Sequence, residues 1–526
     1  MFSLSRHLLR RTYSHSSVAY GYAKRLPEYK EKIPITEQKD FVLSSLKDPI
    51  TSWPDFKTSV LSKQGIMTEK NFDGVILKLM ITSRNYRAAL SFVEFIKKTN
   101  VELSLGSING ILRLYATVSL EHKLTDEQQK FILDMYDYLY KKYQVLDFTT
   151  SEELLHALCA INEYKKSFKV LEDIYLSSTP STSSFSTLIA TLWNVDKKIE
   201  ALQLMQRSLE EKRPLQDKVY HAWIEHINRK YKHKKTRVRH MEEICSFIAK
   251  NFITLTEASA AKLRDNFVLY GWKAQNTSIR KQNGQCVSCT EFLDDLKLTE
   301  AEFGLLQNNV KDKLIVGSDL FLKSSPDELK RFLHFLDKNG PFDTVLDALN
   351  IALAVGKGNN ADKANFLAKV VNYFTENNTN ILLLGRKHML NWPRKPMEYI
   401  ASQAPCFYTD DLSQDDPYFI TAAIMSGPKT DIVSKDLLRS HHFLMKDDRL
   451  RLLFRRWQWQ HQWMVFMGKK KMPHIQPPLK FTPCAQHNNG IWHLPFQKED
   501  LDTFGRVNDG YPAWSTWLCL RPDNPS

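Results

Sequence analysis

Four aspartates in the C-terminal half of the chain lie where strands are expected to end or where helices are expected to begin: Asp347, Asp415, Asp416 and Asp436. If these carboxylates converge, they repel one another unless cations neutralise them. Hard oxygen ligands of this kind suit Mg²⁺ or Mn²⁺, which keep waters and take phosphate oxygens as further ligands. A pair of such ions can activate water for attack on a phosphodiester. The pattern therefore predicts a hydrolytic nuclease.

Each aspartate also has a simpler interpretation. Asp is common at helix N-caps, so Asp415 or Asp416 could only cap the helix that follows. The nearby Asp410 and Asp411 could also exchange roles with that pair. The nuclease prediction therefore depends on the four carboxylates meeting in space, and not on any one of them.

The elements that must position these aspartates are strands and helices that alternate between residues 341 and 470. A strand from Thr344 is expected to end in Asp347 and Asn350. Further strands are expected at residues 381–385 and 431–436, and helices at residues 361–377, 415–425 and 447–462. Alternation of this kind predicts a parallel sheet with helices on both faces. Ligands of such sheets collect at the carboxyl ends of the strands, where the aspartates are expected.

A second set of chemically competent residues begins with the CxxC pair Cys286 and Cys289. Two thiolates at this spacing can reach one tetrahedral zinc ion, but two ligands do not close a structural site. The C-terminal segment offers His493 and Cys519 as the remaining ligands, with Cys484 and His487 as nearby competitors. A redox role would require a thioredoxin-like unit, which the surrounding pattern lacks. The expected role of a zinc ion here is structural.

The first half of the chain reads as paired helices with an internal repeat of about 35 residues. The segments that begin at Phe72 and Phe185 match at several offsets, and a third copy covers residues 150–174. A helix from Ile108 fills the first gap if residues 119–124 are an insertion. Such a period predicts an α-solenoid. The pentatricopeptide type binds RNA and is preferred, but the tetratricopeptide type, which usually binds peptides, has nearly the same period.

Basic charge is concentrated after this array. Seven Lys or Arg residues lie between residues 229 and 239, and the whole chain has 73 Lys and Arg against 59 Asp and Glu, a formal charge of +14. Such a cluster attracts phosphates in a salt-dependent way. A solvated surface without a specific ligand explains the cluster equally well.

The composition and the N-terminus limit the class of protein. With 526 residues, 43% hydrophobic and 25% charged, the chain is expected to fold into several domains. No apolar run is long enough for a membrane span, and seven irregularly spaced cysteines do not form a disulfide framework. Residues 1–25 lack acidic side chains and are rich in Arg and Ser, which is typical of a mitochondrial transit peptide. A disordered basic tail is the alternative.

The motifs together resemble the catalytic subunits of animal mitochondrial protein-only ribonuclease P. The resemblance is carried by DALN at residues 347–350, TDDLSQDDPYFITAA at 409–423, IVSKDLLRSHH at 432–442, WQWQHQ at 457–462 and WH at 492–493. That family joins a pentatricopeptide array, a split zinc module and a PIN-like (NYN) metallonuclease domain.

The resemblance implies a multidomain chain with an α-solenoid, a small zinc module and an α/β nuclease domain with a parallel sheet. The expected segments are a transit peptide at 1–25, an N-terminal extension at 26–69, a pentatricopeptide array at 70–260, a zinc module at 261–335 with 482–526, and the nuclease domain at 336–481.

The resemblance also implies an activity, which is removal of the 5′ leader from mitochondrial precursor tRNA with a 5′ phosphate left on the tRNA. It implies that Asp347, Asp415, Asp416 and Asp436 hold magnesium or manganese, with two ions expected. The implied zinc ligands are Cys286, Cys289, His493 and Cys519, and the implied RNA contacts near the scissile phosphate are Arg439, His441 and His442.

The resemblance further implies partners and a place of action. A tRNA methyltransferase-like subunit and a short-chain dehydrogenase subunit are expected in the complex, in the mitochondrial matrix, with no membrane contact. The alternatives are a non-catalytic mitochondrial RNA-binding repeat protein and a general mitochondrial RNA nuclease.

Overall fold

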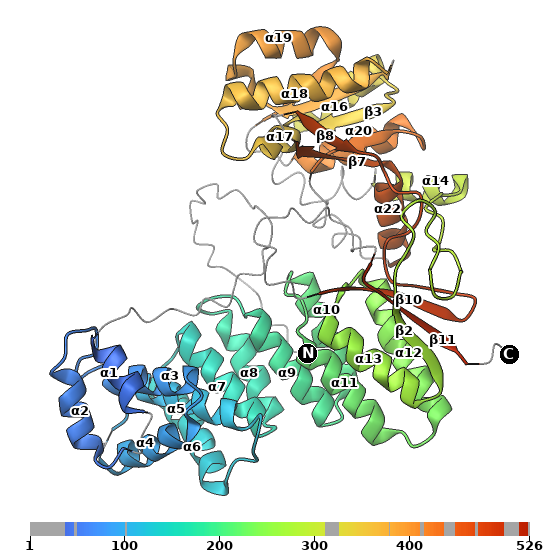
Figure 1. Cartoon of the computed structure of the whole chain (residues 1–526). Helices are drawn as coiled ribbons and strands as arrows, with labels where there is room; N and C mark the ends of the chain where they lie inside the picture. The colour runs from blue at the N-terminus through green and yellow to red at the C-terminus, as the bar shows by residue number, and fades with distance from the viewer. Residues whose placement is uncertain are drawn as a thin grey trace, which may run out of the picture. The chain divides into compact units, whose positions relative to one another are not determined.

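The structure is a computed structural model that describes residues 37–46, 50–99, 102–310, 326–377, 379–410, 415–435, 448–468, 472–498 and 515–523 (Figure 1). The chain forms two compact units, Met1–Pro180 and Ser181–Ser526. The expected transit peptide lies outside the described residues. Within the described ranges, no helix combines the length and the apolar character that crossing a bilayer requires.

The first unit is helical throughout its described part. Its helices are α1 (Glu37–Ser45), α2 (Trp53–Leu61), α3 (Phe72–Thr82), α4 (Tyr86–Thr99), α5 (Leu105–Val118), α6 (Asp126–Lys142), α7 (Phe148–Ala160) and α8 (Tyr164–Ile174). Ser104 caps α5 and Asp147 caps α7, and each side chain accepts a hydrogen bond from the third helical residue. The expected N-terminal extension packs onto the array, because Trp53 contacts Phe92 with 4.8 Å between ring centroids.

The second unit also begins with helices, which are 13 to 17 residues long. They are α9 (Thr182–Asn194), α10 (Lys198–Glu210), α11 (Asp217–Lys230), α12 (Lys234–Lys250) and α13 (Glu257–Leu269). Within the described array, helix pairs begin at residues 72, 105, 148, 182 and 217. The longest interval follows residue 105, and the expected insertion falls in the connection between α5 and α6. The predicted helical repeat is confirmed.

A small sheet follows the helices in the second unit. Its strands are β1 (Leu255–Thr256), β2 (Trp272–Thr277), β9 (Gln486–Asn488), β10 (Ile491–Gln497) and β11 (Trp517–Pro522). The strand order is β1-β10-β11-β2, and β9 pairs with β10. Strands from residues 255–277 therefore pair with strands from residues 486–522, so the split module expected from the sequence is held together by backbone hydrogen bonds.

The α/β domain contains a six-stranded sheet in the order β5-β4-β3-β6-β7-β8. All neighbouring strands are parallel except the last pair. The strands are β3 (Thr344–Asp347), β4 (Ile381–Arg386), β5 (Cys406–Thr409), β6 (Asp431–Val433), β7 (Gln462–Met467) and β8 (Pro473–Gln476). The helices are α14 (Glu300–Val310), α16 (Pro326–Asn339), α17 (Ala348–Ala352), α18 (Asn360–Thr375), α19 (Arg394–Gln403), α20 (Asp415–Ser426) and α22 (Asp448–His461), with short 3₁₀ turns η2 (Leu353–Val355) and η3 (Lys387–Asn391).

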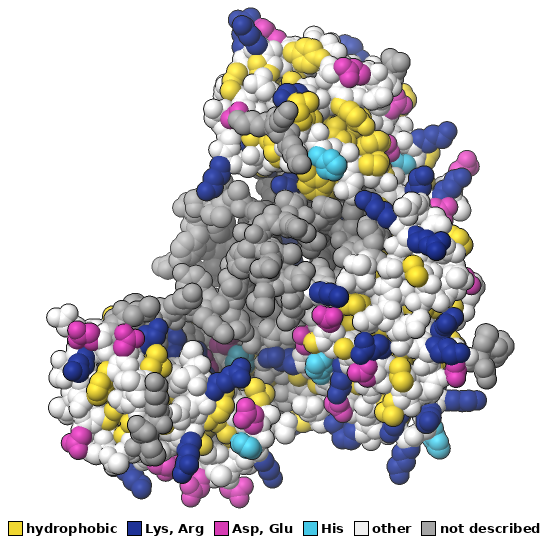
Figure 2. Space-filling view, in the orientation of Figure 1, with side chains coloured by type: hydrophobic (Ala, Val, Ile, Leu, Met, Phe, Trp, Pro, Cys, Tyr) yellow, Lys and Arg dark blue, Asp and Glu magenta, His cyan; other side chains and the backbone are white. Residues whose placement is uncertain are grey.

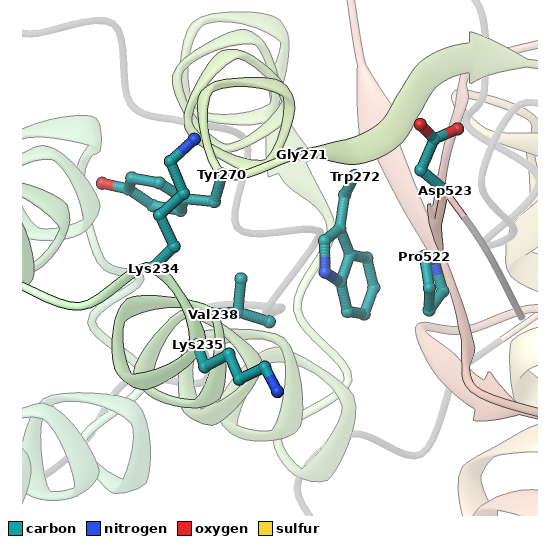
Figure 3. A pocket seen from close by; sticks show the side chains of 8 residues that line it. All are labelled: Lys234, Lys235, Val238, Tyr270, Gly271, Trp272, Pro522 and Asp523. Carbon is teal, nitrogen blue, oxygen red and sulfur yellow. The ribbon is translucent and has the colours of Figure 1, made fainter. Parts of the chain in front are cut away.

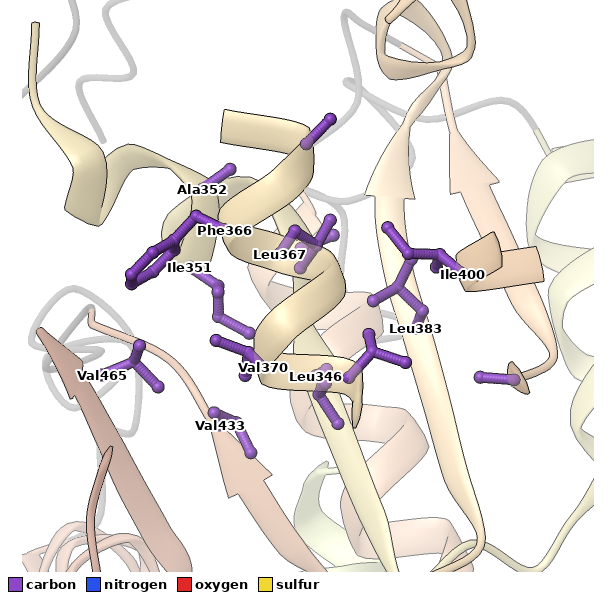
Figure 4. Packing of buried hydrophobic residues seen from close by; sticks show 14 of the residues in the cluster. Leu346, Ile351, Ala352, Phe366, Leu367, Val370, Leu383, Ile400, Val433 and Val465 are labelled. Atoms are coloured by element: carbon purple, nitrogen blue, oxygen red, sulfur yellow. The ribbon is translucent and has the colours of Figure 1, made fainter. Parts of the chain in front are cut away.

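Alternating side chains of the strands build a core on each face of this sheet. Val345 joins a cluster with residues of α14, α16, α20 and α22. Its neighbour Leu346 joins a cluster with residues of α17, α18 and α19 (Figure 4). Strand residues alternate between faces, so a fully buried strand with helices on both sides must be apolar at every position. This arrangement agrees with the predicted fold class.

One expectation from the sequence needs correction, and the packing bears on another. Asn350 was expected in the first strand, but the strand ends at Asp347 and Asn350 lies in α17. The expected boundary between zinc module and nuclease domain, at residues 335 and 336, falls inside the α/β core. Phe303 of α14 and Phe332 of α16 are buried there against strand and helix residues of the domain. The expected domain bounds stay a prediction, and this packing associates α14 and α16 with the α/β domain.

The charged side chains are widely distributed. Lys and Arg side chains lie among acidic ones over the face drawn in Figure 2. The positive charge of the chain therefore does not by itself locate a binding surface, and each basic side chain has to be judged by its contacts.

Candidate active site and metal centre

Four sulfur and nitrogen ligands gather beside the small sheet: Cys286, Cys289, His493 and Cys519. Their ligand atoms all lie within 4.8 Å of one another. His493 of β10 and Cys519 of β11 are directly paired across the antiparallel ladder. Directly opposite residues point to the same face, so the register itself brings these two ligands together. Cys289 Sγ lies 3.2 Å from His493 Nε2.

The CxxC pair is positioned by a tight turn. The Cys286 amide donates a hydrogen bond to the Glu291 carbonyl, and Thr290 N donates to the Cys286 carbonyl. Gly284 precedes the turn with φ of +74°, and a Cβ there would lie 2.7 Å from the Phe481 ring. Glycine satisfies both the left-handed backbone and this close approach. The turn therefore directs both thiols toward the strand pair.

The donor set fits a tetrahedral metal ion. Three thiols and one imidazole are a common structural zinc set, and such a site closes without a position for water. The hydrogen bond from the Cys519 thiol lowers the pKa of Cys286, and the same bond raises the pKa of Cys519, while burial raises the pKa of Cys289. The thiolate is the form that binds metal. These residues thus have the chemistry and the distances of a metal site.

The two competing ligands lie in different surroundings. Cys484 is buried in an apolar cluster with Leu296, Trp459 and Met464, and burial raises its pKa to about 12. The His487 ring stacks on Trp492, with 4.5 Å between ring centroids. Neither side chain belongs to the group of four ligands.

Asp347 is the one carboxylate of the expected nuclease site whose side chain the structure describes. It ends β3 and is buried, with 5% of its surface exposed. Its Oδ1 accepts a hydrogen bond from Asn350 N at 3.1 Å, and its Oδ2 accepts from Asn350 Nδ2 at 2.6 Å. Oδ2 also accepts from Ser434 Oγ at 2.9 Å. A buried carboxylate held by three donors keeps a fixed orientation at the end of the strand.

Asp347 lies at the edge of the sheet where the parallel strands end. β3 pairs with β4 on one side and β6 on the other, so the carboxyl ends of all three strands share this edge. Strand β5 also ends here, and the next described element is α20, which begins with Asp415 and Asp416 and packs against β3. The topology therefore brings the start of α20 to the same edge as Asp347.

The other expected site residues lie, wholly or in their side chains, outside the described part of the chain. The backbone of Asp415 and Asp416 opens α20, but their side chains lie outside the described residues. Asp436, Arg439, His441 and His442 also lie outside them. The meeting of four carboxylates therefore stays a prediction.

The alternative carboxylate Asp410 has other partners. Its side chain forms an ion pair with Lys387, and its amide donates a 2.6 Å hydrogen bond to Glu328 Oε1. Glu328 is fully buried. Asp411 lies outside the described residues. Asp410 is thus engaged in contacts that tie the end of β5 to α16.

Comparisons with known proteins identify the family. A family model described as protein-only RNase P matches residues 280–519. The mitochondrial ribonuclease P catalytic subunit of Mus musculus is 30% identical over 434 residues, which are 79% of this chain and 70% of that protein. The protein of the same name from Rattus norvegicus is 30% identical over 427 residues, with the same coverage. This chain belongs to the protein-only RNase P family.

A solved structure is also similar to this chain. The nuclear proteinaceous RNase P 2 of A. thaliana aligns over 87% of this chain and 100% of that chain, with 16% identity and a TM-score of 0.47. The family resemblance read from the sequence is thus confirmed by the sequence relatives.

Sequence reasoning missed several residues at this edge of the protein-only RNase P domain. Ser434 bonds Asp347 directly, and Gln462 Nε2 donates to the Ser434 carbonyl at 3.0 Å. Gln458 Nε2 in turn donates to Gln462 Oε1 at 2.6 Å. Ser434 stands two positions before Asp436, and both glutamines lie in the WQWQHQ motif. The motifs contained these residues, but their spacing alone does not reveal contacts across strands.

Proposed function

We propose that this chain is a metal-dependent endoribonuclease that removes the 5′ leader from mitochondrial precursor tRNA. The observation that carries the proposal is the buried Asp347 carboxylate at the carboxyl edge of the parallel sheet, beside the start of α20, in a protein-only RNase P. Relatives named as mitochondrial ribonuclease P catalytic subunits support the substrate and the compartment. The expected transit peptide and the mitochondrial matrix belong to the same proposal.

Magnesium, or manganese, is the proposed catalytic cofactor, with two ions held by Asp347, Asp415, Asp416 and Asp436. Bound divalent ions supply a water of lowered pKa and stabilise the leaving oxygen. The contribution of the chain itself begins with Asn350 and Ser434, which fix the Asp347 carboxylate by hydrogen bonds. We propose that Arg439, His441 and His442 bind the RNA near the scissile phosphate.

The proposed ion for the second metal centre is zinc, bound by Cys286, Cys289, His493 and Cys519. The closeness of the four ligand atoms supports this assignment. The site would join the turn after β2 to the β10–β11 pair. Its role would be to stabilise the small sheet, because four protein ligands leave no position for a reacting water.

The helical array is the proposed tRNA-binding part. Its helix pairs have the length of pentatricopeptide repeats, and folded RNA is recognised mainly through shape and phosphates. The proposed partners are a tRNA methyltransferase-like subunit and a short-chain dehydrogenase subunit. The family resemblance supports these partners.

A cleavage assay tests the proposal. The purified chain, alone and with its expected partners, is incubated with precursor tRNA and with a hairpin that lacks the tRNA elbow. We expect magnesium-dependent release of the leader, with a 5′ phosphate on the tRNA, and weak cleavage of the hairpin. Equal cleavage of both RNAs would support a general nuclease. Unchanged function of an Asp347→Asn variant would support a non-catalytic RNA-binding protein.

A further inference from the structure

The basic segment at residues 229–239 contains two arginines whose side chains form hydrogen bonds within the protein. Arg229 Nη2 donates to Asp196 Oδ1 at 2.7 Å and to the Trp193 carbonyl at 3.0 Å. Arg237 donates to the carbonyls of Tyr231 and Asn228 at 2.6 and 3.0 Å. These guanidinium groups donate hydrogen bonds to carbonyls at helix ends. Their N–H donors are therefore engaged within the protein.

Two lysines of the same segment have a different environment. Lys234 and Lys235 open α12, both are exposed, and neither has a hydrogen-bond or ion-pair partner in the described parts of the chain. They line a cavity of about 390 Å³ between α12, the end of α13 and the ends of β2 and β11. In Figure 3 Lys234 lies beside Tyr270, whereas Lys235 and Val238 lie on the side of Trp272.

The remaining lining of this cavity can bind an anionic ligand that also carries an aromatic ring. Trp272 is only partly buried, and its indole contacts Phe267 with 5.0 Å between ring centroids. Gly271, between Tyr270 and Trp272, has φ of +89°. A Cβ there would meet no atom within 4 Å, so no side chain fills the space above this backbone. The cavity size lies at the lower end of the range for small-ligand sites, roughly 300–1,000 Å³.

Among the described residues that line the cavity, the one acidic side chain is paired with a lysine outside the cavity and not with Lys234 or Lys235. Asp523 Oδ1 forms a 2.7 Å ion pair with Lys273. Lys273 does not line the cavity, so it neutralises Asp523 from outside. The cavity therefore combines a partly exposed indole with two ammonium groups that have no partner among the residues that the structure describes.

We propose that this cavity binds one unpaired nucleotide of the precursor RNA, with the base against Trp272 and the phosphate between Lys234 and Lys235. Aromatic side chains with nearby cations bind single-stranded nucleic acid without strict sequence preference. The identity of the RNA as precursor tRNA rests on the proposed function. A free nucleotide has the same chemistry, and an acidic peptide would satisfy only the lysines.

The test measures binding by the full chain to labelled precursor tRNA and to a labelled ten-nucleotide oligouridylate. The variants are the double substitution Lys234→Ala with Lys235→Ala, and Trp272→Ala with Trp272→Phe as its conservative partner. The matched control is Lys338→Ala with Lys429→Ala. These two lysines are also exposed and have no partner in the described residues, but they lie at the amino edge of the α/β sheet. Melting temperatures report on folding.

We expect the Lys234 and Lys235 double variant to bind both RNAs about tenfold more weakly. The salt dependence should fall by about 0.7 for the single strand, because the contact with one phosphate is lost. Trp272→Ala should lose about tenfold and Trp272→Phe less. In the cleavage assay KM should rise while kcat stays within twofold. The control pair should bind like the unmodified protein.

Several results would overturn the proposal. One is a loss for the Lys234 and Lys235 double variant no larger than that of the control pair. Another is unchanged RNA binding by Trp272→Ala. A third is saturable binding of uridine monophosphate, or of oligoglutamate, that the variants abolish while RNA affinity is unchanged. If the chain cleaves no precursor tRNA but the variants still lose RNA binding, the proposed function fails and the nucleotide site stands.

Discussion

The Cys/His cluster and the carboxyl edge of the α/β sheet are both candidate metal sites, but they are built differently. In the cluster, two of the four ligands are fixed by strand register, because His493 and Cys519 are directly paired. At the sheet edge, Asp347 is fixed at the end of a strand and held by Asn350 and Ser434. Its expected partner ligands follow other strands or open a helix.

The two sites differ in what fixes the positions of their ligands. Ligands on paired strands inherit their positions from the backbone hydrogen bonds of the sheet. Ligands beyond strand ends depend on the connections that follow, and repulsion between carboxylates opposes their approach until cations arrive. The first site should therefore control folding, and the second should control chemistry with little effect on folding.

The largest effect is expected from loss of a cluster ligand. Cys519→Ser should reduce bound zinc from one ion per chain to none and lower stability by several kcal/mol, because structural zinc in small peptides contributes about 10–16 kcal/mol. Elemental analysis and thermal unfolding measure both. The matched control is Cys484→Ser, which removes a buried thiol outside the cluster and should keep the metal. Full zinc content in Cys519→Ser would show that the cluster is not the metal site.

The next effect concerns chemistry alone. Asp347→Asn should slow cleavage of precursor tRNA by more than about hundredfold, roughly 2.7 kcal/mol of activation free energy, while zinc content and melting temperature stay close to the unmodified values. Asp343→Asn is the control, because Asp343 lies at the other end of the same strand and accepts a hydrogen bond from Asn380 N at 2.9 Å. Equal activity of both variants would contradict a catalytic role for Asp347.

The smallest effect on cleavage is expected from loss of the hydrogen bond between Ser434, just after β6, and Asp347 of β3. Ser434→Ala removes one donor to the Asp347 carboxylate, and hydrogen bonds to charged groups contribute about 1.5–3 kcal/mol. We expect about tenfold slower cleavage and a higher magnesium concentration at half-maximal rate. Ser434→Thr keeps the hydroxyl and should restore much of the activity. An unchanged magnesium dependence in Ser434→Ala would mean that the serine only supports packing.

Much of the fold was readable from the sequence because its signals are local. The repeat at residues 72 and 185 and the alternation after residue 341 come from neighbouring side chains. The end of the first strand was placed too late, because the apolar run continues into α17 without a change of character. The sequence did not show which core α14 and α16 join, because both carry ordinary amphipathic patterns and only packing distinguishes the cores.

The sequence by itself determined the periodicity of the helices, the alternation of strands and helices after residue 341, the excess of positive charge and the residue types that can bind metal. Only the tertiary structure decided that His493 lies opposite Cys519, that Ser434 reaches Asp347, and that Lys234 and Lys235 share a cavity with Trp272. The physical reason is that helix and strand periods arise from residues a few positions apart. Contacts between distant segments depend on strand register and side-chain packing, which one-dimensional spacing does not specify.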